Sequence, residues 1–317
     1  MNSLTDTEPI VDGDDTIAAA LSQLSVSALT ASVVQITGDA AVLRGPIRPR
    51  QFVQNEFQGM LDAEEQAQLR RDALKAICSW RDAGCPPPAR LEPAVIHEVM
   101  NWIACEPVPA SDVALYTEEM DLAGENPRAI HLPGKTALPE GFSVLIIGLG
   151  ASGLLAAIRL REAGIPFEIV EKNAGVGGAW YENSYPGCRV DVASHFYSYS
   201  FERNNDFSQY YTRQPELQAY FRKTMEEHRI GDHVRWNTEV ARAAWDDETA
   251  RWSVTLKAAD GAVQTRDASV LISGVGVLNR PLIPDIAGLD RFEGPVFHSA
   301  QWDHSVDLRG KRVALVG

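Results

Sequence analysis

VLIIGLGASG, residues 144–153, is the stretch that decides the fold of this chain. Its apolar start precedes three glycines at G-x-G-x-x-G spacing, and a helical pattern runs from Ala151 to Ala163. A short, continuous apolar run is typical of a strand buried in a parallel sheet. The order of strand, glycine turn and helix therefore predicts a βαβ unit that binds a dinucleotide.

The three glycines of this turn have separate physical tasks. Gly148 allows the tight turn, Gly150 lets the backbone approach a pyrophosphate, and Gly153 lets the helix pack closely on the strand. The phosphates would then face the positive N-terminal end of the helix, where Ser152 lies in the first turn.

An acidic residue follows the second predicted strand, Phe167–Val170. Glu171 stands where a carboxylate accepts hydrogen bonds from the adenosine ribose hydroxyls, and Lys172 beside it is a further candidate contact. A 2′-phosphate would be repelled by that carboxylate. We therefore expect this site to take FAD or NAD rather than NADP.

A second pattern, GGAW at residues 177–180, is followed by YPG at 185–187 and by Asp191. A flexible glycine pair, including Gly178, next to the flat indole of Trp180 suits a flavin-bearing cofactor. The stretch resembles the loop of the type I Baeyer–Villiger monooxygenases, A/G-G-x-W-x4-F/Y-P-G/M-x3-D, and matches it without a gap.

A second fingerprint of that family reads F-x-G-x3-H-x3-W-P/D. In the family this segment links the FAD and NADPH domains, so the resemblance implies the same linker role here. The residues that meet the fingerprint are Phe292, Gly294, His298, Trp302 and Asp303.

The resemblance also implies roles for single residues. Trp180, Asp191, Tyr197 and the backbone of Val240 would contact FAD. Asp191 would in addition be catalytic, because in the family it pairs with an arginine that stabilises the peroxyflavin anion. The implied reaction reduces FAD with NADPH, forms a C4a-peroxide with O2 and converts a ketone to an ester.

Residues 1 to about 138 form a region of helical patterns with no catalytic constellation. Examples are Ile17 and Leu21, then Leu29 and Val33 with Ser27 as a cap. Further helical faces are expected around Leu69, Ala73, Ile77 and Trp80, and after Pro93 with Ile96, Met100 and Ile103. This extension resembles that of the 4-hydroxyacetophenone monooxygenases, which implies aryl ketones as substrates and leaves a homodimer through these helices as a hypothesis.

The predicted fold class is α/β: a Rossmann-like FAD-binding βαβ domain after an all-α extension. A proline- and glycine-rich linker is expected over residues 126–141. The predicted organisation is a helical extension with its linker over 1–138, the FAD domain over 139–290, and a linker fingerprint with one further strand over 291–317. Further elements of the FAD domain are a helix over Glu216–His228 and strands over Ala241–Trp245, Trp252–Leu256 and Ala268–Ser273, with a turn at Asp260-Gly261.

KRVALVG, residues 311–317, has the pattern of the first strand of a second dinucleotide fold and stops at its first glycine. The family's catalytic arginine and a clear NADP phosphate site are not found in the sequence. We therefore expect an N-terminal part of a longer enzyme, inactive by itself, whose NADPH site lies mostly outside these residues.

Composition narrows the remaining function classes. The net charge of −14 argues against non-specific binding to nucleic acid or to an anionic membrane. The chain has neither a signal peptide pattern nor an apolar run long enough to span a bilayer. Its four cysteines lack metal-ligand spacing. These features predict a cytoplasmic protein that acts on a small ketone and O2.

Two alternatives stay open from the sequence. The first is an N- or S-oxygenating flavin monooxygenase, although Trp302-Asp303 is unusual for those enzymes. The second is an incomplete module that binds FAD or serves only in association.

Overall fold

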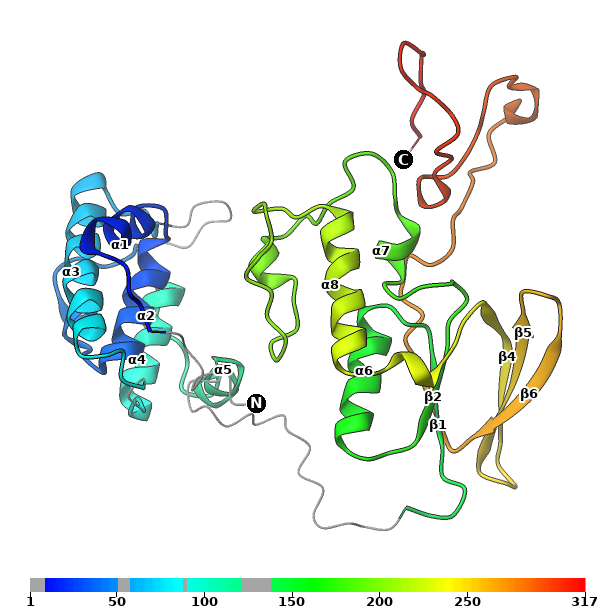
Figure 1. Cartoon of the computed structure of the whole chain (residues 1–317), viewed down its shortest axis with the longest axis horizontal. Helices are drawn as coiled ribbons and strands as arrows, with labels where there is room; N and C mark the ends of the chain where they lie inside the picture. The colour runs from blue at the N-terminus through cyan, green and yellow to red at the C-terminus, as the bar shows by residue number, and fades with distance from the viewer. Residues whose placement is uncertain (1–8, 51–57, 88–89, 121–137, 317) are drawn as a thin grey trace. The chain divides into compact units, whose positions relative to one another are not determined.

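The computed structural model describes residues 9–50, 58–87, 90–120 and 138–316 (Figure 1). The chain divides into two compact units, Met1–Ala129 and Ile130–Gly317, called here the N-terminal and the C-terminal unit. Of the linker predicted over residues 126–141, the part from 126 to 137 lies outside the described residues.

The N-terminal unit is built from helices. The predicted start of a helix at Pro93 is confirmed, because proline is tolerated in the first turn, where backbone N–H groups have no partner within the helix. The predicted cap at Ser27 is wrong: the helix begins at Val26, and the N-cap position is Ser25, two residues before Ser27. The helices are α1 (Asp14–Leu21), α2 (Val26–Thr37), α3 (Ala63–Asp82), α4 (Pro93–Ala104) and α5 (Val113–Met120).

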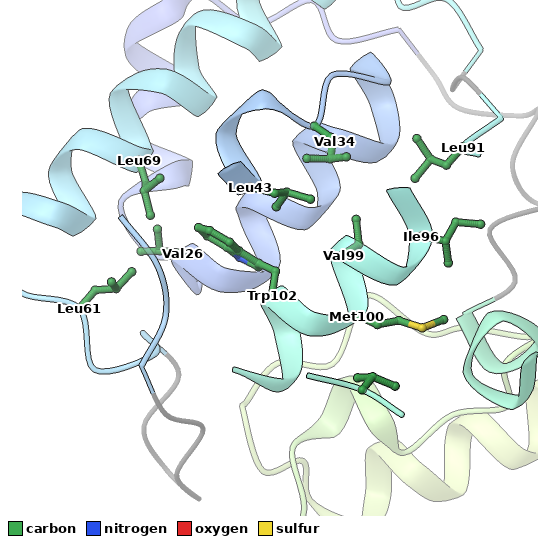
Figure 2. Packing of buried hydrophobic residues seen from close by; sticks show 12 residues of the cluster. Val26, Val34, Leu43, Leu61, Leu69, Leu91, Ile96, Val99, Met100 and Trp102 are labelled. Carbon is green, nitrogen blue, oxygen red and sulfur yellow. The ribbon is translucent and has the colours of Figure 1, made fainter. Parts of the chain in front are cut away.

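The main core of this unit lies where α2, α3 and α4 meet (Figure 2). Trp102 is 4% exposed and packs with fully buried Val26 and Val34 of α2. The indole Nε1 of Trp102 donates a hydrogen bond to the carbonyl oxygen of Ser27, 3.3 Å away. A second cluster, with Ile17 of α1, closes the other side. Most of the predicted apolar faces thus form a helical core, but Ile103, predicted on the same face as Ile96 and Met100, is 42% exposed.

The C-terminal unit has a parallel sheet of order β3-β2-β1-β7 at its centre. The predicted central strand and the strand Phe167–Val170 are confirmed, and they pair in register from Val144 with Phe167 to Ile147 with Val170. The four strands are β1 (Val144–Ile147), β2 (Phe167–Val170), β3 (Val234–Arg235) and β7 (Val270–Ser273).

The two faces of this sheet are covered by different elements (Figure 1). Helices α6 (Ala151–Glu162) and α8 (Gln214–Glu227) pack on the face that carries Ile146 and Ile169. The opposite face, with Leu145, packs against an antiparallel sheet. Because side chains alternate along a strand, each central strand is buried on both faces, which explains its continuous apolar sequence.

The antiparallel sheet has the order β4-β5-β6. The prediction of one strand over Ala268–Ser273 is wrong in one respect. Ala268 ends a strand of the antiparallel sheet, and Val270–Ser273 forms a strand of the parallel sheet. The chain changes sheets at Ser269, where the N–H groups of Ser269 and Val270 both donate to the carbonyl oxygen of Ser143. The apolar pattern continues through this point and so hides the change. The strands are β4 (Thr238–Asp246), β5 (Arg251–Ala258) and β6 (Val263–Ala268).

The predicted strand at residues 311–317 does not form in the described part, residues 311–316. A strand needs a neighbour for its backbone hydrogen bonds, and this run has no strand partner among the described residues. Its apolar side chains therefore stay exposed, with Leu315 at 90%. No helix in the described part of the chain is long and apolar enough to cross a membrane.

Candidate functional site

A cavity of about 560 Å³ lies where β1, β2 and β7 end. Ligands of open parallel sheets bind at the carboxyl ends of the strands, and pockets for cofactor-sized ligands have volumes of about 300–1,000 Å³. We call it the glycine-loop cavity. Sequence-predicted residues that line it are Gly148, Gly150, Ser152, Glu171, Lys172, Gly178, Trp180, Tyr197 and Val240.

The glycine loop, residues 148–153, has no room for side chains at its critical points. Gly148 has a φ of 89°, and a Cβ there would lie 2.8 Å from the carbonyl oxygen of Gly274. A Cβ on Gly153 would lie 2.0 Å from the carbonyl oxygen of Gly148. Gly153 is buried behind the loop and does not line the cavity. Its role here is the close packing of α6 on the loop.

The N-terminus of α6 opens into this cavity through Ala151 and Ser152. Gly150 is the N-cap, and none of the described side chains caps the helix. First-turn N–H groups without partners make a helix start a binding site for anions. The hydroxyl of Tyr199 donates to the carbonyl oxygen of Ala151, and burial raises the pKa of Tyr199, so it stays a donor.

Glu171 holds the glycine loop through a hydrogen bond to its backbone. The residue is 2% exposed, and its two carboxylate oxygens accept hydrogen bonds from the N–H of Leu149 at 2.6 Å and of Asn173 at 2.8 Å. A carboxylate oxygen can accept two hydrogen bonds, so each keeps one position for a ligand hydroxyl. The sequence predicts the ribose role of Glu171 but not this support of the loop.

An ion pair connects three walls of the cavity. Lys172 Nζ lies 2.7 Å from Glu182 Oε1 and donates to the carbonyl oxygen of Asn279 at 3.0 Å. Asn173 Nδ2 donates to the same Glu182 oxygen at 3.0 Å. Sequence reasoning missed Glu182, Asn173 and the carbonyl of Asn279 because no motif marks them.

Two aromatic side chains form one side of the cavity. Trp180 lies in the short helix α7 (Ala179–Glu182), and its Nε1 donates to the hydroxyl of Tyr197 at 2.9 Å. Their rings are perpendicular, with centroids 5.5 Å apart. Two residues predicted only from the family motif thus contact each other and form one wall.

Asp191 is not brought to the cavity. Its neighbour Val190 is 2% exposed and its N–H donates to the carbonyl oxygen of Thr212. Asp191 lies in a bend and is exposed, as is Val192 after it, and Asp191 is not among the residues that line the cavity. The structure therefore does not place the predicted catalytic carboxylate beside the other cofactor residues.

The predicted linker fingerprint contacts the loop that follows α7. Trp302 lies against Tyr185, with ring centroids 6.5 Å apart, and His304 Nε2 is 2.9 Å from the hydroxyl oxygen of Ser184. The two fingerprints, distant in sequence, therefore meet in space.

The other fingerprint residues act locally. His298 Nδ1 accepts from the N–H of Ala300 at 3.0 Å, and the ring of Phe292 lies over Gly294. Asp303 accepts from the hydroxyl and the N–H of Ser305, which lowers the pKa of Asp303. These contacts set the local shape of the segment.

Comparison with known proteins agrees with this fold. Residues 146–213 match the family described as "NAD(P)-binding Rossmann-like domain". The matched range contains the glycine loop, Glu171 and the GGAW pattern. Together with the parallel strand order, this match assigns a Rossmann-like fold to the C-terminal unit.

Curated relatives are monooxygenases. An uncharacterised monooxygenase of Sinorhizobium fredii is 35% identical over 95% of this chain and 45% of its own length. A Baeyer–Villiger monooxygenase of Pseudomonas aeruginosa is 49% identical over 55% of this chain and 32% of its own length. An FAD-binding monooxygenase of Aspergillus terreus is 38% identical over 58% of this chain and 33% of its own length. The chain spans less than half the length of each of these relatives.

Solved structures with similar sequences are also monooxygenases. An oxidised steroid monooxygenase bound to NADP is 37% identical over 51% of this chain and 32% of its own, with a TM-score of 0.46. Cyclohexanone monooxygenase from Rhodococcus sp. Phi1 bound to NADP+ is 32% identical over 53% and 32%, with a TM-score of 0.47. The assignment of a Rossmann-like fold rests on the strand order of the parallel sheet and on the family match.

Proposed function

We propose that this chain supplies the FAD site of a monooxygenase that uses NADPH and O2 to convert a ketone to an ester. The observation that carries the proposal is the gathering of motif residues around one cavity of suitable size. The glycine loop, Glu171, Trp180, Tyr197 and Val240 come from five separate parts of the sequence and line the same space. The Pseudomonas relative, named a Baeyer–Villiger monooxygenase, supports the reaction class.

The residues present fit FAD. The glycine loop offers close backbone approach and a helix N-terminus for a pyrophosphate, and Glu171 keeps acceptor positions for ribose hydroxyls. When bound, FAD would supply the redox chemistry, and the chain would hold and orient it. The Trp180–Tyr197 wall would shield one side of the cofactor from water.

Asp191 has a separate place in the proposal. It is exposed in this structure and is therefore open to an arginine from outside these residues, which is the pairing that we propose. We therefore treat Asp191 as a residue of the working enzyme and not of the cavity described above.

The proposed substrate is an aryl ketone. The support is the helical N-terminal unit, whose sequence resembles the extension of the 4-hydroxyacetophenone monooxygenases. Apolar residues exposed on its helices, such as Leu115 and Ile103, make a homodimer through this unit part of the proposal.

We also propose that these 317 residues bind FAD but do not oxidise NADPH by themselves. Among the described residues there is one parallel sheet, and residues 311–316 do not extend it or begin another.

Two assays test the proposal. Titration of the purified chain with FAD should show one binding site and quenched flavin fluorescence, while added NADPH stays unoxidised. In the second assay, residues 138–316 replace the matching segment of the Pseudomonas relative. This chimera should make an ester from a ketone that the unmodified Pseudomonas enzyme converts, and its Gly150→Asp variant should not. Oxygenation of amines or sulfides alone, with no ester, would contradict the reaction class.

A further inference from the structure

Helix α8 carries two glutamines that reach the segment around Trp180. Gln214 and Gln218 are four residues apart and therefore lie on the same face of the helix. Gln218 Nε2 donates to the carbonyl oxygen of Val176 at 2.6 Å, and Gln214 Nε2 donates to the carbonyl oxygen of Trp180. The two hydrogen bonds hold both ends of residues 176–180, which we call the tryptophan segment.

The backbone of this segment is irregular. Gly177 has a φ of 124° and Gly178 a φ of 56°, values that side chains rarely allow. A Cβ on Gly178 would lie 2.9 Å from the Cα of Gly150, so the segment touches the glycine loop directly. The helix that follows, α7, has one turn only. Such a segment needs contacts from outside to have one conformation.

Helix α8 is a firm base for these contacts. Leu217, Tyr220 and Phe221 are at most 5% exposed, and Tyr220 and Phe221 belong to the core under the parallel sheet. Gln218 itself fills the space beneath Gly177, where a Cβ would lie 2.4 Å from Gln218 Oε1. That oxygen is buried and has no hydrogen-bond partner among the described residues. The amide is therefore oriented by the bond that its nitrogen donates to Val176.

We propose that Gln214 and Gln218 are positioning residues that hold the tryptophan segment, and with it the indole of Trp180, against the cofactor. The inference rests on the proposed FAD site for its consequence, but the two hydrogen bonds act on the free protein as well. Neither residue lines the cavity, so both would act through the segment.

The first test measures amide hydrogen exchange of the full chain without FAD. In the double variant Gln214→Leu/Gln218→Leu, exchange in residues 177–181 should rise about thirtyfold, as expected when two hydrogen bonds worth about 1 kcal/mol each are lost. Arg222→Leu, exposed and one turn further along the same face, is the control and should leave it unchanged. Unchanged exchange in the double variant would overturn the proposal.

The same variants then report on the cofactor. Each single glutamine variant should weaken FAD binding about fivefold to tenfold, the loss expected for one hydrogen bond. Wild-type affinity in both variants would overturn the positioning role. If the wild-type chain binds no FAD, the proposed function fails, while the exchange result still decides whether the two glutamines hold the segment.

Gln218→Glu separates hydrogen bonding from packing. The carboxylate has the shape of the amide but no proton to donate, whereas the protonated carboxyl group can donate to Val176. Relative to wild type at each pH, FAD binding should be weak at pH 8 and recover towards pH 5. A deficit that does not change with pH would show that the side chain only fills space. Circular dichroism of each variant controls for folding.

Discussion

The two units of this chain use buried polar side chains differently. In the described part of the N-terminal unit the buried polar residue is Thr30, whose hydroxyl donates to the carbonyl oxygen of Val26 in its own helix. In the C-terminal unit, Glu171 and Ser194 bond backbone groups of other segments. Burying a polar group is unfavourable unless it is hydrogen-bonded. Glu171 and Ser194 therefore mark backbone segments that are held in one conformation.

The comparison explains where a site can form. The N-terminal unit is held by apolar helix faces, and substitutions there should change its stability alone. The C-terminal unit also holds irregular loops in place with glycines and buried polar groups. Substitutions at those points should change stability and cofactor binding together.

The largest effect is expected in the core of the N-terminal unit. Trp102→Ala should lower the free energy of unfolding of that unit by about 3–5 kcal/mol, because it removes the largest side chain of the cluster in Figure 2 and leaves a cavity. FAD affinity should not change. Chemical denaturation and FAD titration of the same sample measure both quantities. A loss of FAD binding in a folded C-terminal unit would break the comparison.

A smaller loss of stability, but a complete loss of binding, is expected from Gly153→Ala. The new Cβ would lie 2.0 Å from the carbonyl oxygen of Gly148, so helix α6 or the loop must shift. Overpacking of this kind costs about 1–3 kcal/mol, and the shift would spoil the pyrophosphate site. Gly231→Ala is the control, since its Cβ would meet nothing within 4 Å. Equal FAD affinity in the two variants would contradict the packing role of Gly153.

Glu171→Gln should lower the stability of the C-terminal unit by about 1–3 kcal/mol. The amide nitrogen would face the N–H of Leu149 or of Asn173 and leave a buried donor without a partner. FAD affinity should fall as well, because the glycine loop loses its support. Thermal unfolding with and without FAD measures both effects. If stability falls but FAD affinity stays the same, Glu171 is structural only.

The smallest effect is expected at Glu216, in the first turn of α8. Hydrogen bonds from the hydroxyl and the N–H of Ser208 lower the pKa of Glu216 in the folded state. Its stabilising effect should therefore be present at neutral pH and be lost as the pH falls through that lowered pKa. Glu216→Gln should cost about 0.3–1 kcal/mol at pH 7. The difference in the free energy of unfolding between wild type and Glu216→Gln should shrink as the pH falls. A difference that grows in acid would contradict a lowered pKa of Glu216 in the folded state.

Local patterns predicted the fold well. Four apolar residues before Gly148 and the run Phe167–Val170 gave the central strands, because strands buried on both faces carry their pattern in the sequence alone. The change of sheet at Ser269 and the unpaired run at 311–316 were not predictable in this way. Both depend on which partner a strand finds, and that is set by distant residues.

Part of the site was predictable for the same reason. The glycines and Glu171 follow from the geometry of one βαβ unit. The contacts of Glu182, Gln214 and Gln218 depend on how α7 and α8 pack, and no spacing rule shows them. Asp191 follows a family pattern, but its position depends on how the bend at residues 191 and 192 folds, which no motif shows.

The most direct test of the central claim is a titration of the purified 317-residue chain with FAD in the presence and absence of excess NADPH. The glycine-loop cavity should bind one FAD per chain, and NADPH should not compete, because Glu171 at the ribose position disfavours a 2′-phosphate. Trp180→Ala should reduce the quenching of flavin fluorescence. A folded chain that binds no FAD, or one from which NADPH displaces FAD, would contradict the account.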